Sequence, residues 1–114
     1  MVVIACVPLI ACNAPDWRPA AIADAEGKVR QEISDPAAQF TRVQITGDSK
    51  TGRTCGYTTA NVGAFGMQHT LRFIVYIDAT AGPFVEAGMG QHPVSQQDFD
   101  RDWQSDCVNE GYRA

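Results

Sequence analysis

The sequence predicts an α+β fold, an antiparallel sheet of three or four strands with an N-terminal and a C-terminal helix packed on one face, in the order α-β-β-β-α. Residues 70–78 carry apolar side chains on both alternating faces, which predicts a central strand. Apolar residues recur at three- and four-residue steps in 22–33 and again in 99–107, which indicates two helices with one buried stripe each. Each stripe needs a sheet face to cover it.

The N-terminal helix is expected to begin at Asp16, whose carboxylate can accept hydrogen bonds from free N–H groups of the first turn. Its buried stripe consists of Ile22, Ala25, Val29 and Ile33. Asp35 is pushed out of the helical region by Pro36, so the helix should end near Ser34. Asp35 then caps a single turn that runs through Gln39.

The strands are predicted from two-residue alternation and turn residues. Residues 40–46 alternate Thr41, Val43 and Ile45 against more polar neighbours, which indicates a half-buried strand. The segment GDSKTG, residues 47–52, is rich in turn formers and predicts a hairpin into a second strand from Arg53. That strand pairs antiparallel with 70–78, and residues 84–86 add a short edge strand after the break at 81–83.

The C-terminal helix is predicted from its cap and its stripe. Ser95 has the side chain that helix N-termini prefer, and Gly111 is placed to end the helix in a left-handed conformation. Phe99, Trp103 and Cys107 recur every four residues and form the buried side. The opposite side is acidic and is interpreted as a solvated face.

Size and charge restrict the function classes. The 114 residues fit one domain, here residues 13–114, and 45% hydrophobic with 19% charged residues is an ordinary globular composition. The net charge of −4 and the scattered basic residues argue against a nucleic-acid partner. His69 and His92 lack metal-ligand spacing with the four cysteines, so no metal and no cofactor is predicted.

Residues 1–12, MVVIACVPLIAC, are uncharged and end in Leu-Ile-Ala-Cys, which resembles the lipobox of bacterial lipoproteins. On this interpretation Cys12 is the lipidation candidate, and a lipid anchor there would be the only contact with a membrane. The segment has no basic residues before its apolar run, unlike an ordinary signal peptide. The alternative is a buried N-terminal strand.

Cys55 and Cys107 are expected to form a disulfide in an oxidising compartment. Cys55 points from one face of a strand, and Cys107 lies on the buried stripe of a helix that should cover the sheet. The alternative is two buried free thiols in a reducing compartment. A lipobox-like start and a disulfide support each other.

Residues 35–40, DPAAQF, and 55–67, CGYTTANVGAFGM, continuing to Arg72 and Phe73, resemble the pattern DPxSAxF followed by CGxVNAKNxFGGYxGxxxF. This pattern belongs to a family of small, mostly proteobacterial and sometimes prophage-borne envelope proteins. The first motif is one residue short, and Thr59, Phe65 and Met67 depart from the second. The resemblance implies a periplasmic or outer-membrane-anchored location and no established activity.

The function predicted is that of a small non-enzymatic envelope domain that binds a protein or glycan partner through the loop 60–68. Phe65 and Met67 are large apolar residues in a glycine-rich segment that is otherwise expected to be polar. The candidate binding residues are Tyr57, Asn61, Phe65, Gly66, Met67 and Arg72. The alternatives are a structural loop whose apolar side chains pack on the core, and an inhibitor or exclusion factor that plugs an enzyme cleft.

A further alternative is a hydrolase with a Cys/His site. Cys12 or Cys55 would be the nucleophile and His69 or His92 the base, but nothing in the sequence orients either histidine. Cys55 is better used in a disulfide. No catalytic residue is therefore predicted.

Overall fold

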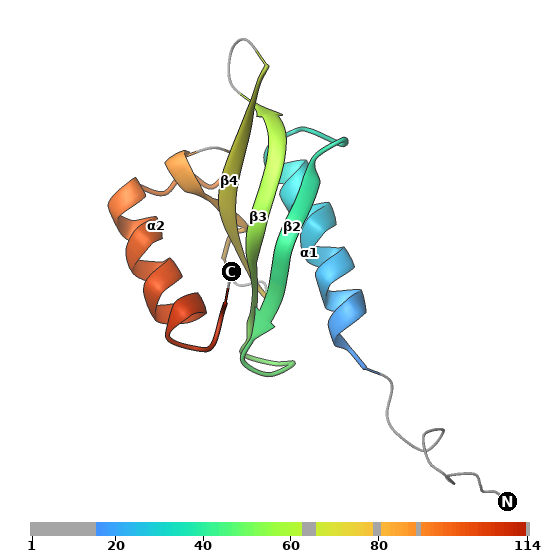
Figure 1. Ribbon diagram of the computed structural model, residues 1–114, viewed down its shortest axis with the longest axis vertical. Helices are drawn as coiled ribbons and strands as arrows, with labels where there is room; N and C mark the ends of the chain where they lie inside the picture. Colours follow the sequence, from blue (N-terminus) through green and yellow to red (C-terminus); the bar gives the residue numbers. More distant parts are fainter. Residues whose placement is uncertain (1–15, 63–65, 79–80, 89, 114) are drawn as a thin grey trace, which may run out of the picture.

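The computed structural model describes residues 16–62, 66–78, 81–88 and 90–113. The predicted segment 1–12 with Cys12, and Phe65 of the predicted loop, lie outside the described residues. The described chain is an α+β fold, as predicted, with a four-stranded antiparallel sheet in the order β2-β3-β4-β5 and helices flanking it (Figure 1). Its elements are α1 (Arg18–Glu32), β2 (Gln39–Thr46), β3 (Arg53–Val62), β4 (Met67–Tyr76), β5 (Phe84–Val85), a short 3₁₀ segment (Glu86–Gly88), α2 (Gln96–Asp102) and the π-helical η3 (Trp103–Val108).

The two helices lie on opposite faces of the sheet, so the prediction that both pack on one face is wrong (Figure 1). Phe73 and its period-two neighbours on β4 contact α1, whereas Ile74 on the same strand contacts the C-terminal helix. The physical reason is in the central strand itself. Because β4 is apolar on both faces, each face needs its own cover.

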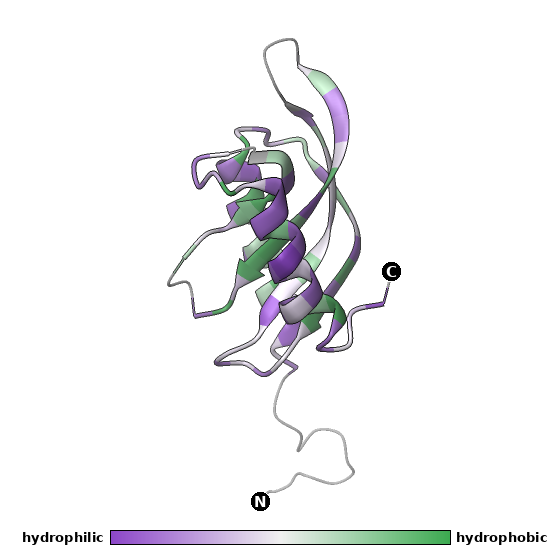
Figure 2. Ribbon diagram, turned by 90° about the vertical axis from the view of Figure 1, so that its left-hand side faces the viewer, coloured by the Kyte–Doolittle hydropathy of each residue, from purple (hydrophilic) through white to green (hydrophobic). Residues whose placement is uncertain are grey.

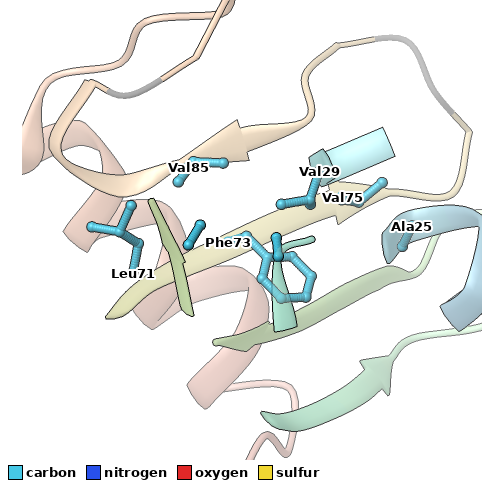
Figure 3. Close-up of a cluster of buried hydrophobic side chains, with 8 residues drawn as sticks. Ala25, Val29, Leu71, Phe73, Val75 and Val85 are labelled. Carbon is cyan, nitrogen blue, oxygen red and sulfur yellow. The ribbon is translucent and has the colours of Figure 1, made fainter. Parts of the chain in front are cut away.

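The α1 face of the sheet has an aliphatic core around one aromatic residue (Figure 3). Phe73 is fully buried and meets the ring of Phe40 edge-on at 5.5 Å between centroids. The buried members of this cluster are Ala25, Val29, Ala38, Ala60, Leu71, Phe73, Val75 and Val85. Ala25 and Val29 confirm the predicted stripe of the N-terminal helix.

The other face is covered by α2 and η3, and its core is aromatic and cross-linked. Cys55 and Cys107 form the predicted disulfide, with a Cα–Cα distance of 6.2 Å. The buried members are Cys55, Ile74, Phe99, Trp103, Cys107 and Tyr112. The outward side of α2 is hydrophilic, as the acidic pattern predicted (Figure 2).

Strand β2 departs from the predicted alternation. A bulge between Thr41 and Gln44 shifts the register against β3, and Arg42 has a φ of 54°. As a result Phe40 and Val43, three residues apart, both pack on the α1 core. The buried hydroxyl of Tyr112 donates to the Arg42 carbonyl oxygen at 2.8 Å, and burial raises the pKa of Tyr112 to about 12.

The caps predicted for the C-terminal helix are present, but the cap position of α1 is Trp17 and not Asp16. The Ser95 hydroxyl accepts from the Asp98 N–H at 3.1 Å at the start of α2, and Gly111 has a φ of 112° after η3. Asp16 accepts from the Arg18 N–H at 3.1 Å, one residue before the helical cap position. In the first hairpin Asp48 accepts from the N–H groups of the turn, and these bonds lower its pKa.

Candidate functional site: the arm formed by β3 and β4

Strands β3 and β4 continue beyond their neighbours and form a two-stranded arm, which we define as residues 59–62 and 66–70 (Figure 1). Pairing of β2 with β3 ends at Gln39 and Thr59, whereas β3 and β4 stay paired up to Val62 and Met67. Within the predicted loop 60–68, residues 60–62 and 67–68 are therefore strand. Its two ends extend the hairpin, and Gly66 has a φ of 62° that suits a turn.

Asp35 fixes the base of the arm. One carboxylate oxygen accepts from the Ala37 N–H at 3.0 Å, which confirms the predicted cap, although the turn ends before Gln39, where β2 begins. The other oxygen accepts from the Asn61 N–H at 2.9 Å. The residue is 9% exposed. The carboxylate thus occupies the β3 edge at the point where β2 no longer covers it, and this side of the arm is closed.

The opposite side of the arm, along β4, has an open backbone edge. The Arg72 N–H points away from β3, because it donates to a Glu86 carboxylate oxygen at 2.6 Å. Backbone groups alternate with a period of two along a strand, so Gln68 and Thr70 turn their N–H and C=O groups to the same side. Among the described residues β5 pairs only with Phe73 and Ile74, and no strand covers Gln68 or Thr70.

The β4 half of the arm is exposed, whereas Ala60 on β3 is still buried in the α1 core. Every residue from Gly66 to Thr70 is exposed, and Met67 has 62% of its surface accessible. On the α2 side the hydroxyls of Thr59 and Thr70 lie 3.1 Å apart in a cross-strand pair. Between Arg53 and Arg72 the sequence contains no Asp, Glu, Lys or Arg.

The predicted binding residues do not form one surface. Tyr57 and Arg72 are register partners below the arm, on the α2 face, where Tyr57 meets Trp103 edge-on at 5.8 Å. Asn61 and Met67 lie on the arm but on opposite faces, because their positions differ in strand parity. Only Asn61, Gly66 and Met67 of the six belong to the exposed arm, and Phe65 lies outside the described residues.

Arg72 ties the sheet to the C-terminal helix. Its guanidinium donates to Glu86 at 2.9 Å and to Asp100 at 2.5 Å, and its carbon lies 5.2 Å from the Phe99 ring centre. Burial alone would lower the pKa of Arg72, but the hydrogen bonds to the two carboxylates raise it. Burial likewise opposes ionisation of Glu86, but the bonds from Arg72 and Gln96 lower its pKa. These contacts stabilise the base of the arm. Because the Arg72 guanidinium already pairs with Glu86 and Asp100, it is not free to bind a partner.

The Glu32 carboxylate orients His92, although nothing in the sequence predicted an oriented histidine. His92 Nδ1 lies 2.7 Å from Oε1 of Glu32, and the His92 backbone N–H donates to the other oxygen of the same carboxylate. The Glu32 side chain is 2% exposed, whereas the His92 side chain is 47% exposed. The two residues are 60 positions apart in the chain, and no sequence pattern joins them, so the pair could not be predicted.

The remaining chemistry of the described residues is limited. The Cys55 sulfur is bonded to Cys107 and is therefore no thiol nucleophile. Within the described ranges, no group of three or more His, Cys, Asp or Glu residues is placed to hold a metal ion. In the same ranges, no helix has both the length and the hydropathy needed to cross a membrane.

The comparisons with known proteins found no relative. No family model matches the chain, and no curated protein and no solved structure matches it significantly. Any functional assignment therefore depends on the sequence and the geometry of this chain.

Proposed function

We propose that this protein is a small, non-enzymatic envelope domain that binds an extended segment of a partner protein along the β4 edge of the arm. The bound segment would add a strand beside Gln68 and Thr70 and pair with their backbone groups. The observation that carries the proposal is an open strand edge with no Asp, Glu, Lys or Arg along it.

The absence of charge is informative because exposed edges are a hazard. Proteins usually protect them with lysine, proline, bulges or a covering segment, since an open edge pairs with any available strand. The β2 edge of this sheet follows that rule, with the bulge at Arg42 and the Tyr112 hydroxyl on its carbonyl. The β4 edge of the arm has none of these protections among the described residues, which fits an edge that is used.

The contacts of Asp35 and Glu86 determine which part of the arm a partner strand can reach. Asp35 occupies the β3 edge and Glu86 occupies the Arg72 N–H, so a partner strand has room only along residues 67–71 of β4. Met67 lies at one end of this stretch and offers an apolar contact. The partner is thus expected to be a short segment with an apolar side chain near the tip of the arm.

The location in the envelope is part of the same proposal. The Cys55–Cys107 disulfide supports an oxidising compartment, because such bonds are rare in reducing ones. The lipobox-like residues 1–12 and the family resemblance point the same way. A periplasmic domain, or one anchored at Cys12, would have access to partner segments in the envelope.

The test uses two variants at one position. Thr70→Pro removes the outward N–H without disturbing the pairing with β3, whereas Thr70→Ala keeps that N–H; both lose the hydroxyl. Peptides of about ten residues would be selected from a random library against the full chain and their affinities measured by fluorescence anisotropy. We expect Thr70→Pro to weaken binding about tenfold, the value of one lost hydrogen bond, and Thr70→Ala to leave it nearly unchanged.

Three results would overturn the proposal. Equal loss in both variants would mean that the hydroxyl, not the edge, binds the peptide. Selection of a glycan by the same surface, with no peptide binding, would replace the partner class. Concentration-dependent dimers that disappear in Thr70→Pro would show that a second copy of the chain occupies the edge.

A further inference from the structure

A pocket beside the first residues of β2 is separate from the arm edge and contains an immobilised arginine. It has a volume of about 390 Å³, and its walls are formed by Glu26, Arg30, Gln39 and Phe40 together with residues 36–38. A second hollow of about 330 Å³ shares Arg30 and Pro36 with it. Arg30, in the last turn of α1, lines both hollows.

The Arg30 guanidinium is held from two directions. Its Nε donates to the Ala38 carbonyl oxygen at 3.2 Å, and its central carbon lies 4.9 Å from the centre of the Phe40 ring. These contacts fix the plane of the group before any ligand arrives, which reduces the conformational entropy lost on binding.

The terminal nitrogens of Arg30 are not used. Among the described residues, Arg30 makes no hydrogen bond through either Nη atom and forms no ion pair, and its one side-chain hydrogen bond is that of Nε. Glu26, one helical turn earlier, lines the same pocket without pairing with Arg30. The pocket thus offers two parallel donors in a fork.

A backbone donor lies in the same wall. Thr59 faces β2 with its backbone groups, since the Asn61 N–H two residues on points to that side, and its register partner is Gln39. Phe40 therefore turns its N–H away from β3, toward the unpaired edge of β2. A guanidinium fork, together with an N–H group that the sheet does not use on a residue lining the same pocket, is a donor set suited to an oxyanion.

We propose that the Arg30 pocket binds a singly charged carboxylate, either of a small organic acid or of a peptide C-terminus. The choice of a carboxylate over phosphate follows from the charges around Arg30. Glu26 and the carbonyl end of α1 both bring negative charge near the pocket and disfavour a doubly charged anion. A planar monoanion matches the guanidinium fork and suffers this repulsion least.

The experiment is an NMR titration of the full-length ¹⁵N-labelled chain with acetate, using acetamide as the neutral isostere and inorganic phosphate as the competing oxyanion. We expect saturable shifts of the Arg30 Nε–H and the Phe40 amide with acetate, and an affinity at least about tenfold weaker for acetamide. A short peptide with a free C-terminus, compared with its C-terminal amide, distinguishes the two sources of the carboxylate. Tighter binding of the free-acid peptide than of acetate would assign the peptide.

Two variants keep the test decisive. Arg30→Gln should abolish the acetate shifts. If that variant does not fold, Glu26→Gln provides the test. Removal of the repelling carboxylate should strengthen acetate binding and reduce the ratio of acetate affinity to phosphate affinity. The absence of saturable shifts, equal binding of acetamide, preference for phosphate, or an unchanged affinity in Glu26→Gln would each overturn the proposal.

Discussion

The same two strands behave differently at their two ends. In the body of the sheet, β3 and β4 are covered on both faces, and Cys55 and Phe73 have no accessible surface. In the arm, beyond the buried Ala60, the described side chains of β4 are exposed, and Met67 has 62% of its surface accessible. The difference shows that the pairing of β3 with β4 does not depend on burial along its whole length, because the hairpin register set in the body continues into the arm.

The body and the arm therefore have separate roles. The covered part supplies stability through apolar burial, a disulfide and the ion pairs of Arg72. The arm contributes little burial and keeps an unpaired edge, which is a feature expected of a binding surface. Substitutions in the body should unfold the protein, and substitutions in the arm should leave folding intact.

The largest effect is expected for Phe73→Ala. Phe73 is fully buried against Phe40 and the aliphatic core, so its truncation leaves a cavity and should lower the free energy of unfolding by about 4–5 kcal/mol. Urea denaturation followed by circular dichroism measures this. A loss below about 1 kcal/mol would mean that the α1 face does not supply the stability assigned to it.

Loss of the disulfide should have a slightly smaller effect. Cys55 and Cys107 are separated by 52 positions, and closing a loop of that size stabilises a fold by about 4 kcal/mol in the chain-entropy model. Cys107→Ala should lower the melting temperature of the oxidised protein strongly and that of the reduced protein hardly at all. Equal losses in both forms would assign the effect to packing.

The state of the sulfurs can be checked directly. Thiol labelling of the denatured, non-reduced chain, followed by peptide mass mapping, should leave Cys55 and Cys107 unmodified. Labelling of both would contradict the bridge and, with it, the proposed oxidising compartment.

A moderate, pH-dependent effect is expected at Glu86. The fold lowers the pKa of Glu86 from its ordinary 4.5, so the unfolded chain takes up the proton first as the pH falls. The stability that comes from this carboxylate is therefore complete above about pH 4.5 and is lost as the pH drops through the lowered value. Glu86→Gln should cost about 1–2 kcal/mol at pH 7 and flatten the acid limb of the stability curve.

The matched control for this variant is Glu110→Gln. Its carboxylate is 53% exposed and lies 3.9 Å from Arg53, so the substitution should change stability at pH 7 by less than about 0.5 kcal/mol. Chemical denaturation at several pH values compares the two. An acid limb as steep in Glu86→Gln as in the unmodified protein would contradict the role given to the Arg72 cluster.

The elements that depend on local patterns could be predicted from the sequence. The stripe of α1, the Ser95 cap, the Gly111 stop and the alternation in β4 all follow from neighbours within a few residues. The disulfide also followed, because one cysteine lies on a strand face and the other on a helix stripe.

The features that could not be predicted depend on long-range register. The bulge at Arg42 changes which residues of β2 face the core, and no glycine or other turn-forming residue in this part of the sequence predicts it. The placement of the helices on opposite faces follows from both faces of β4, which the sequence showed as apolar but did not assign to partners. The arm was predicted as a loop because its glycines resemble turn chemistry, whereas pairing with β4 keeps Asn61 and its neighbours in a strand.

The smallest effect on stability is expected for Met67→Ser, the counterpart of Phe73→Ala on the same strand. Because Met67 is 62% exposed, exchanging its thioether for a hydroxyl should change the free energy of unfolding by less than about 0.5 kcal/mol. Binding of the selected peptides should nevertheless weaken, since an apolar contact at the tip of the arm is lost. A melt and an anisotropy titration on the same sample separate the two quantities. If the variant unfolds, Met67 belongs to the core and the division between body and arm is wrong. If it folds and binds as before, the partner strand uses the backbone edge alone.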